Sequence, residues 1–141
     1  MTSKAGEVFW RDLARDLQDP EFLRDYVVES LRIATVDRIV NALDEAREAA
    51  GLSKAELARA IGSQPQVIRR LFTSHAASPT LGTLAEVAGA LGMRVTLTPM
   101  DESERKDVTE PLLEGRTADP ERLAKHLAEM RQPRSRRLIP C

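Results

Sequence analysis

The sequence has very few of the residues that build disulfides, metal sites and catalytic centres. It contains one cysteine, Cys141, and two histidines among 141 residues. A single cysteine excludes an internal disulfide and a zinc site made of several thiolates. His75 and His126 match no metal-binding spacing, and we interpret both as solvent-exposed. A glycine-rich phosphate loop and a nucleophile elbow are also missing, so we expect neither an enzyme nor a cofactor or metal.

Long apolar runs are missing as well. No stretch of about 18 apolar residues offers a membrane span. Charged residues interrupt residues 1–17, which therefore do not resemble a secretory signal. We expect a cytoplasmic protein without a membrane partner. The apolar fraction of 42% is sufficient for one compact domain with extensions.

Charge is unevenly distributed along the chain, although the net charge is only −1. Residues 1–50 carry 7 Lys or Arg against 11 Asp or Glu, a net −4, whereas residues 51–100 carry 5 against 2, a net +3. The basic segment indicates a face for an anionic partner. Solvated helix surface explains the acidic segment, with a basic protein partner as the alternative.

Within the basic segment, residues 52–72 predict two short helices joined by a tight turn. Ser53 with Glu56 forms one capping box, and Ser63 with Gln66 forms a second. Gly62 lies where the first helix must end in a residue that tolerates a left-handed conformation. Each helix has an apolar face for packing on the other, formed by Leu57, Ala58 and Ile61 and by Val67, Ile68 and Leu71.

The outward side chains of the second helix carry amide and guanidinium groups and no carboxylate. In the major groove of DNA, glutamine can form two hydrogen bonds with adenine, and arginine can do the same with guanine. The alternative interpretation is a surface helix that is basic by chance. We expect base contacts from Gln64, Pro65, Gln66, Arg69 and Arg70.

Residues 52–92 resemble the Xre/Cro-type helix-turn-helix regulators of bacteria and phages. The shared motifs are Leu-Ser-Lys-Ala-Glu-Leu-Ala, Ile-Gly-Ser, Val-Ile-Arg-Arg-Leu, Ser-Pro-Thr-Leu-Gly-Thr-Leu and Ala-Leu-Gly. The resemblance implies a five-helix, lambda-repressor-like domain with a phosphate contact at Lys54. After the second helix this chain departs from the family, because Phe72 and the next three residues replace the usual acidic residue and glycine. The predicted phosphate contacts are Lys54, Ser63, Thr73, Ser74 and His75.

Three helices are predicted ahead of the motif. The first has an apolar stripe within residues 8–17, formed by Val8, Phe9, Trp10, Leu13 and Leu17. Asp19 and Pro20 open the second, and Thr35 caps a third that runs to Ala50. The first two helices exceed what the motif needs, and extension of the core or a dimer interface would explain them.

Residues 19–26 resemble the leader of HigA-type addiction-module antitoxins. That resemblance implies a protein that binds and neutralises a small toxin and represses its own operon. Two alternatives remain open: a stand-alone Xre-family regulator without a toxin, and a protein-binding module with a vestigial helix-turn-helix.

After the motif, Thr80 caps a helix over residues 81–91 that ends at Gly92. Residues 93–98 then alternate apolar and polar, which predicts a half-buried strand. The chain offers no second good strand, so we expect this one to pair with a second copy. A two-fold dimer would place two recognition helices about one DNA turn apart. The predicted dimer strand comprises Arg94, Val95, Thr96 and Leu97.

The last part of the chain predicts little core. Residues 101–118 are highly charged without a sustained period, which indicates a linker. Asp119 and Pro120 open a helix with an apolar seam at Leu123, Leu127 and Met130. Residues 131–141 hold four arginines and no acid, which indicates a disordered tail or, alternatively, one that reaches DNA or an acidic partner.

The prediction for the whole protein is a mainly α, homodimeric repressor that binds operator DNA and is associated with the bacterial nucleoid when bound. The expected organisation has four parts. They are a helical extension at 1–34 for partner or dimer contacts, a helix-turn-helix domain at 35–92, a dimerisation strand at 93–99, and a charged linker, short helix and basic tail at 100–141.

Overall fold

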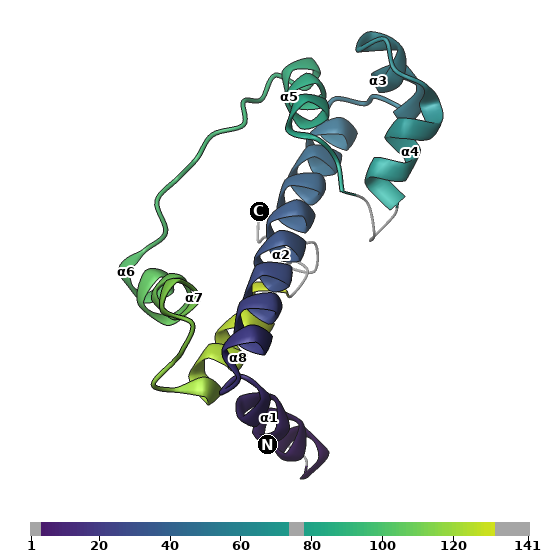
Figure 1. Ribbon diagram of the computed structural model, residues 1–141. Coiled ribbons are helices and arrows are strands. Elements are labelled where there is room, and N and C mark those ends of the chain that lie inside the picture. The colour runs from purple at the N-terminus through teal and green to yellow at the C-terminus, as the bar shows by residue number, and fades with distance from the viewer. Residues whose placement is uncertain (1–3, 74–77, 132–141) are drawn as a thin grey trace. The chain divides into compact units, whose positions relative to one another are not determined.

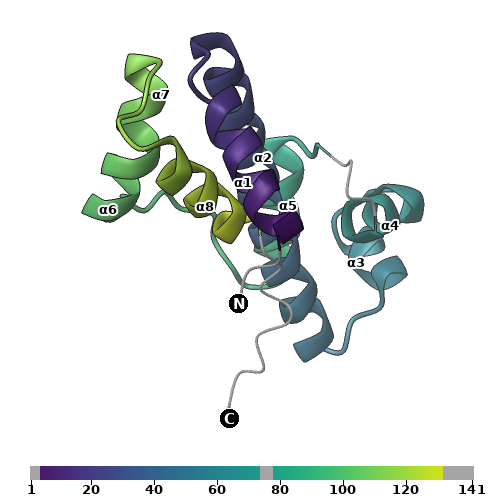
Figure 2. The same ribbon diagram turned by 90° about the horizontal axis from the view of Figure 1, so that it is seen from below.

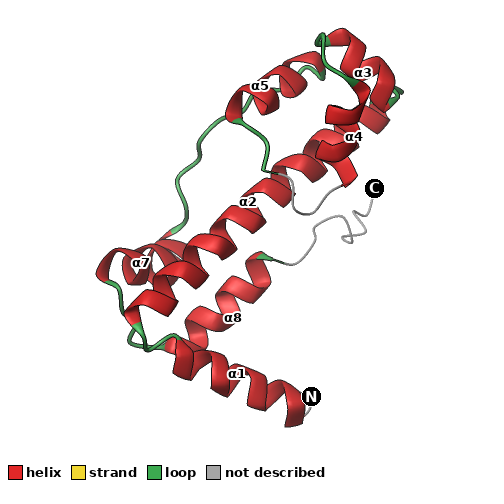
Figure 3. Cartoon of the chain, turned by 45° about the vertical axis from the view of Figure 1, so that its right-hand side comes forward, coloured by secondary structure: helices red, strands yellow, loops and turns green. Residues whose placement is uncertain are grey.

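The computed structural model describes residues 4–73 and 78–131 of the chain (Figure 1). Every regular element in these residues is a helix, as Figure 3 shows, so the mainly α prediction is confirmed. The described residues divide into two compact units, one formed by residues 35–73 and 78–97 and the other by residues 4–34 together with 98–131. Each unit has its own apolar core.

Helix α2 (Pro20–Ala49) contributes residues to both units. The prediction of two separate helices here, with Thr35 as the cap of the second, is wrong, because Thr35 is an exposed residue inside one continuous helix. Residues 31–36 contain neither glycine nor proline, so every residue in this stretch can continue the helical hydrogen-bond ladder.

The unit of residues 35–97 contains the end of α2, α3 (Lys54–Ala60), α4 (Pro65–Thr73) and α5 (Leu81–Ala90). The described residues of this unit thus form one helix fewer than the predicted five. Helix α3 packs against α4 and α5, and Figure 2 shows α3 beside α4. The buried core residues are Leu43, Leu57, Ala58, Ile68, Leu71, Leu84, Val87 and Ala88.

Both ends of α5 follow the sequence prediction. The Thr80 hydroxyl accepts a hydrogen bond from the Thr83 N–H at 3.1 Å. At the other end, Gly92 has φ +73°, and the Met93 N–H donates to the Ala88 carbonyl at 2.7 Å. This arrangement satisfies a carbonyl that would otherwise lack an intrahelical partner.

The strand predicted over residues 93–98 is not observed. These residues have no regular secondary structure, and the described part of the chain contains no strand with which they could form a ladder. Val95 packs against the core of its unit, whereas Leu97 is 99% exposed. Of the apolar face expected for the strand, Val95 is therefore packed within the chain and Leu97 is not.

The second unit is built from both ends of the sequence. Its elements are α1 (Lys4–Asp16), the start of α2, α6 (Glu102–Glu104), the π-helical segment η1 (Arg105–Thr109), α7 (Glu110–Glu114) and α8 (Pro120–Met130). Helix α8 packs against α1. The buried core residues are Leu13, Leu17, Leu23, Val27, Val108, Leu123, Ala124 and Leu127.

Residues 101–118 differ from the predicted linker because most of them are helical and several are buried. Val108 is 1% exposed, Pro111 is buried, and Leu112 packs against the same core. Their spacing of three and one residues suits one face of a helix. The stripe is too short to stand out among the charged residues around it, which explains why the period is not visible in the sequence.

The apolar stripe of α1 is narrower than predicted. Leu13 and Leu17 are buried and Trp10 packs against them, but Val8 and Phe9 are 51% and 54% exposed. Trp10, Leu13 and Leu17 follow a spacing of three and four residues, which keeps them on one helical face. Phe9 lies at the edge of that face, four residues before Leu13, and Val8 lies outside it.

The beginning of α8 agrees with its predicted cap, since the Asp119 carboxylate accepts a hydrogen bond from the Arg122 N–H at 3.1 Å. Arg131, just after the helix, belongs to the predicted basic tail but is bound within its unit. Its Nε and Nη2 donate to the hydroxyl of fully buried Ser30 at 3.1 and 2.7 Å, and its guanidinium lies over the Tyr26 ring. Arg134, Arg136 and Arg137 lie outside the described residues.

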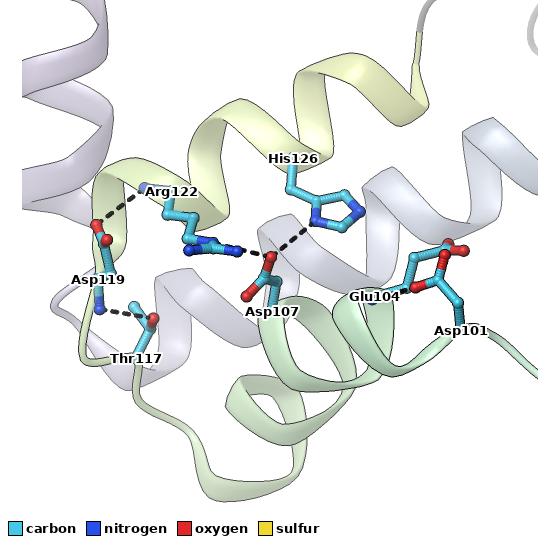
Figure 4. A network of polar contacts seen from close by, with 7 residues as sticks. All are labelled: Asp101, Glu104, Asp107, Thr117, Asp119, Arg122 and His126. Atoms are coloured by element: carbon cyan, nitrogen blue, oxygen red, sulfur yellow. Dashed lines mark hydrogen bonds and ion pairs between the residues drawn. The ribbon is translucent and has the colours of Figure 1, made fainter.

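A polar network joins η1 to α8 (Figure 4). Asp107 Oδ2 lies 3.0 Å from Arg122 Nε and 3.3 Å from His126 Nδ1. The His126 side chain is only 18% exposed, so its interpretation as solvent-exposed is wrong. Burial opposes ionisation of Asp107, but the hydrogen bonds from Arg122 and His126 outweigh burial and hold the pKa of Asp107 below its ordinary value.

Candidate nucleic-acid interface

The start of α3 is fixed by the predicted capping box. The Ser53 hydroxyl accepts a hydrogen bond from the Glu56 N–H, and Glu56 Oε1 accepts one from the Ser53 N–H, both at 3.0 Å. Hydrogen bonding to Ser53, mainly to its backbone and secondly to its side chain, lowers the pKa of Glu56. Lys54 follows as the first residue of the helix and is half-buried. The cap thereby places one cation at the start of α3.

The turn between α3 and α4 depends on Gly62. Its φ is +68°, in the left-handed region, as predicted. The Ser63 N–H donates to the Ala58 carbonyl at 2.8 Å, and the Gly62 N–H donates to the Arg59 carbonyl at 3.2 Å. These bonds close the last turn of α3 and direct the chain into α4.

The second predicted capping box is not formed. Helix α4 begins at Pro65, so Gln64 occupies the position before it. Within the described part of the chain the Ser63 side chain makes no hydrogen bond, while its N–H is used in the turn. Proline at the first helical position has φ already suited to the helix, which accounts for a start two residues after Ser63.

Helix α4 separates an apolar face from a polar one. Ile68 and Leu71 are 0% and 4% exposed in the core of the unit. The residues predicted to contact bases all lie within this helix or directly before it, and the helix contains no acidic residue. Four of the five are exposed, namely Gln64, Gln66, Arg69 and Arg70, and Pro65 is half-buried.

Val67 differs from its prediction. The sequence pattern places it on the buried face together with Ile68 and Leu71, but it is 46% exposed. Ile68 and Leu71 are three residues apart and lie at the centre of the buried face, whereas Val67 lies about 100° around the helix from Ile68 and, four residues before Leu71, at the edge of that face. The core of the unit is closed without it.

The cations near this surface are free of carboxylate partners in the described ranges. Neither Lys54 nor Arg69 nor Arg70 takes part in any of the ion pairs found there. Thr73, a predicted phosphate contact, donates its hydroxyl hydrogen to the Arg69 carbonyl at 2.6 Å. Ser74 and His75, the other predicted contacts of that loop, lie outside the described residues.

Arg47 is a positioning residue that the sequence pattern does not reveal. Its side chain is 13% exposed, and it donates from Nε to Asp44 Oδ1 at 3.0 Å and from Nη1 to the Leu52 carbonyl at 2.7 Å. Its guanidinium lies 5.8 Å from the centre of the Phe72 ring. Arg47 thus joins the end of α2 to the connection that precedes α3 and to the end of α4. The departure of Phe72 from the family pattern is the one signal of this contact in the sequence.

Comparison with known families identifies this arrangement. The Helix-turn-helix family matches residues 43–97, a segment that includes α3, the Gly62 turn, α4 and α5. Residues 43–97 form a helix-turn-helix domain. The domain is of a DNA-binding, transcription-regulating type. No match was found among curated proteins or solved structures.

Two other features of the described residues bear on function. In residues 4–73 and 78–131 no helix is long and apolar enough to cross a membrane. The same residues contain no group of three or more His, Cys, Asp or Glu side chains placed to hold a metal ion.

Proposed function

We propose that this protein is a sequence-specific transcriptional repressor whose α4 enters the major groove of operator DNA. The observation that carries the proposal is the division of α4 into two faces. Ile68 and Leu71 hold the helix in the domain core, while Gln66, Arg69 and Arg70 are exposed without a carboxylate beside them in the helix. Amide and guanidinium groups on one exposed helical face suit base edges.

Phosphate contacts complete the proposed interface. Lys54 lies at the start of α3 without an ion-pair partner in the described residues, so its charge is available to a phosphate. Ser63, Thr73, Ser74 and His75 are the further proposed contacts. Each neutralised phosphate releases counterions, and binding should therefore weaken as salt increases.

Pairing with a second copy through residues 94–97 is the proposed mode of dimerisation. The support is that these residues follow α5 without regular structure and leave Leu97 exposed. An unpaired extended segment can satisfy its N–H and C=O groups on the same segment of another chain. A two-fold dimer of this kind would bring two copies of α4 to one operator.

A second candidate function is that of an antitoxin in a type II toxin–antitoxin module that regulates its own operon. Two observations favour it: residues 19–26 resemble the antitoxin leader, and residues 4–34 with 98–131 have a core separate from that of the DNA-binding domain. A separate unit leaves room for a protein partner without occupying α4. Copurification with the product of the neighbouring reading frame would support this role, whereas operator binding without any such complex would favour a stand-alone regulator.

Substitution of the exposed α4 residues tests the proposed DNA interface. Gln66→Ala and Arg70→Ala should each weaken binding to promoter DNA by about 1–3 kcal/mol and relax discrimination at one base. Arg11→Ala is the matched control, since it removes an exposed arginine from α1 in the other unit. Fluorescence anisotropy with labelled promoter DNA gives the dissociation constants. Equal affinities for all three variants and the unaltered protein would favour a helix-turn-helix kept only as a scaffold.

A further inference from the structure

Val67 is the exposed apolar residue of α4 that the proposed interface does not yet use. It is 46% exposed and lies outside the core cluster, although Ile68 and Leu71 beside it are buried. Single exposed apolar residues are common on protein surfaces, so exposure by itself does not indicate a binding role. Val67 lies at the edge of the buried face of α4, directly beside the exposed polar face.

The neighbours of Val67 are the groups proposed to read bases. Residues three and four apart on a helix are adjacent, so Val67 and Gln66 both lie next to Arg70. Val67 therefore places two methyl groups beside the exposed guanidinium of Arg70, which in turn neighbours the amide of Gln66. A valine in a helix has essentially one side-chain rotamer, and fixing its methyl groups in a contact costs little conformational entropy.

From this placement we infer that Val67 contacts the C5-methyl group of a thymine in the major groove. Thymine presents a methyl group there and cytosine does not, so an apolar contact at this point favours thymine at one position of the operator. The arginine beside Val67 and the glutamine next to that arginine supply hydrogen bonds to adjoining bases. The inference rests on the proposed function and adds one specificity-determining residue to it.

A thymine-to-deoxyuridine scan tests the inference, because deoxyuridine pairs like thymine but lacks the methyl group. The full-length protein first selects a preferred site from a random duplex library. Each thymine of that site is then replaced singly, and affinity is measured for the unaltered protein, Val67→Ala and Val28→Ala. Val28 is 49% exposed on α2, so Val28→Ala makes the same truncation outside α4 and the helix-turn-helix match.

We expect one thymine position, or a symmetry-related pair, at which replacement by deoxyuridine weakens DNA binding. For the unaltered protein the loss of affinity should be about fourfold per methyl group removed. Val67→Ala should weaken binding to the thymine site and lose the response to deoxyuridine, while Val28→Ala should behave as the unaltered protein. Circular dichroism should show undiminished helix in Val67→Ala, since alanine favours helix more than valine does.

Two contrary results are distinguishable. The inference would be overturned if the protein selects a preferred site but no deoxyuridine replacement changes the affinity. It would also be overturned if the replacement changes the affinity of Val67→Ala and of the unaltered protein equally. Both results would leave sequence-specific binding intact. A library that yields no preferred sequence would overturn the proposed function and the inference with it.

Discussion

At the scale of single residues, Gly62 sets the geometry of the turn that presents α4. Its φ of +68° is strained for any residue with a Cβ, although a Cβ added there would meet no atom within 4 Å. Gly62→Ala should therefore lower the free energy of unfolding by about 1 kcal/mol through backbone strain alone. Urea unfolding followed by circular dichroism measures the change.

Gly89 is the matched control for this substitution, because it lies inside α5, has no positive φ, and leaves at least 4 Å of open space around an added Cβ. Gly89→Ala should raise stability by roughly 0.5–1 kcal/mol, since alanine loses less backbone entropy in a helix. Effects of the same sign at the two positions would contradict the assigned role of Gly62.

Lys54 tests the difference between phosphate and base contacts. Lys54→Ala should weaken binding to promoter and unrelated DNA alike and reduce the slope of log affinity against log salt by about 1. Lys106→Ala removes an exposed lysine from η1 in the other unit and should leave the slope unchanged. Anisotropy titrations over a salt series measure both slopes. Loss of affinity for promoter DNA alone would assign Lys54 to base reading instead.

At the scale of helices and their contacts, the Asp107 carboxylate links η1 to α8 through its contacts with Arg122 and His126. Asp107→Asn removes the charged acceptor and should lower the free energy of unfolding by about 1–2 kcal/mol. Trp10 packs against the core of the same unit and is the only tryptophan, so its fluorescence reports the change.

The Asp107 contribution should depend on pH in one direction. Because the pKa in the folded protein is below the ordinary value of 3.8, the stabilisation is fully present above about pH 4 and is lost as pH falls through the folded pKa. The difference between the unaltered protein and Asp107→Asn should accordingly shrink in strong acid. A difference that grows below pH 4 would contradict the proposed ionised state.

Element boundaries that depend on adjacent residues could be predicted from sequence. Ser53, Thr80 and Asp119 all cap helices as expected, and Gly62 and Gly92 both adopt the left-handed conformation. Each of these signals lies within a few residues of the structure that it determines, so local chemistry is sufficient at these five positions. The predicted caps at Thr35 and Ser63 rest on equally local signals and are not formed.

Features that depend on distant contacts could not be predicted in the same way. The burial of Val108 requires a core assembled from both ends of the chain, and His126 meets a carboxylate from η1. The contact of Arg47 with Phe72 likewise joins two helices that are separate in sequence. Val67 shows a further limit, since periodicity alone does not separate an apolar residue beside a buried stripe from the stripe itself.

At the scale of the whole molecule, the helix-turn-helix domain lies in the sequence between the two segments that build the other unit. Each unit has a separate buried core, so neither depends on the other for its apolar contacts. The predicted DNA-contacting residues that the structure describes all belong to residues 35–97.

The basic character of the DNA-binding segment also appears only when charge is considered by region. The protein has a net charge of −1, yet residues 51–100 carry 5 basic and 2 acidic residues. A local excess of cations is sufficient to bring phosphates to α3 and α4 while the remainder stays acidic.

The most direct test of the central claim is an anisotropy titration of the full-length protein against labelled DNA from its own promoter. Scrambled DNA of the same length and composition is the control, and each titration is made at two salt concentrations. We predict promoter binding at least about a hundredfold tighter than scrambled binding, with both weakened by salt. Equal and weak binding to the two DNAs would contradict sequence-specific recognition by α4.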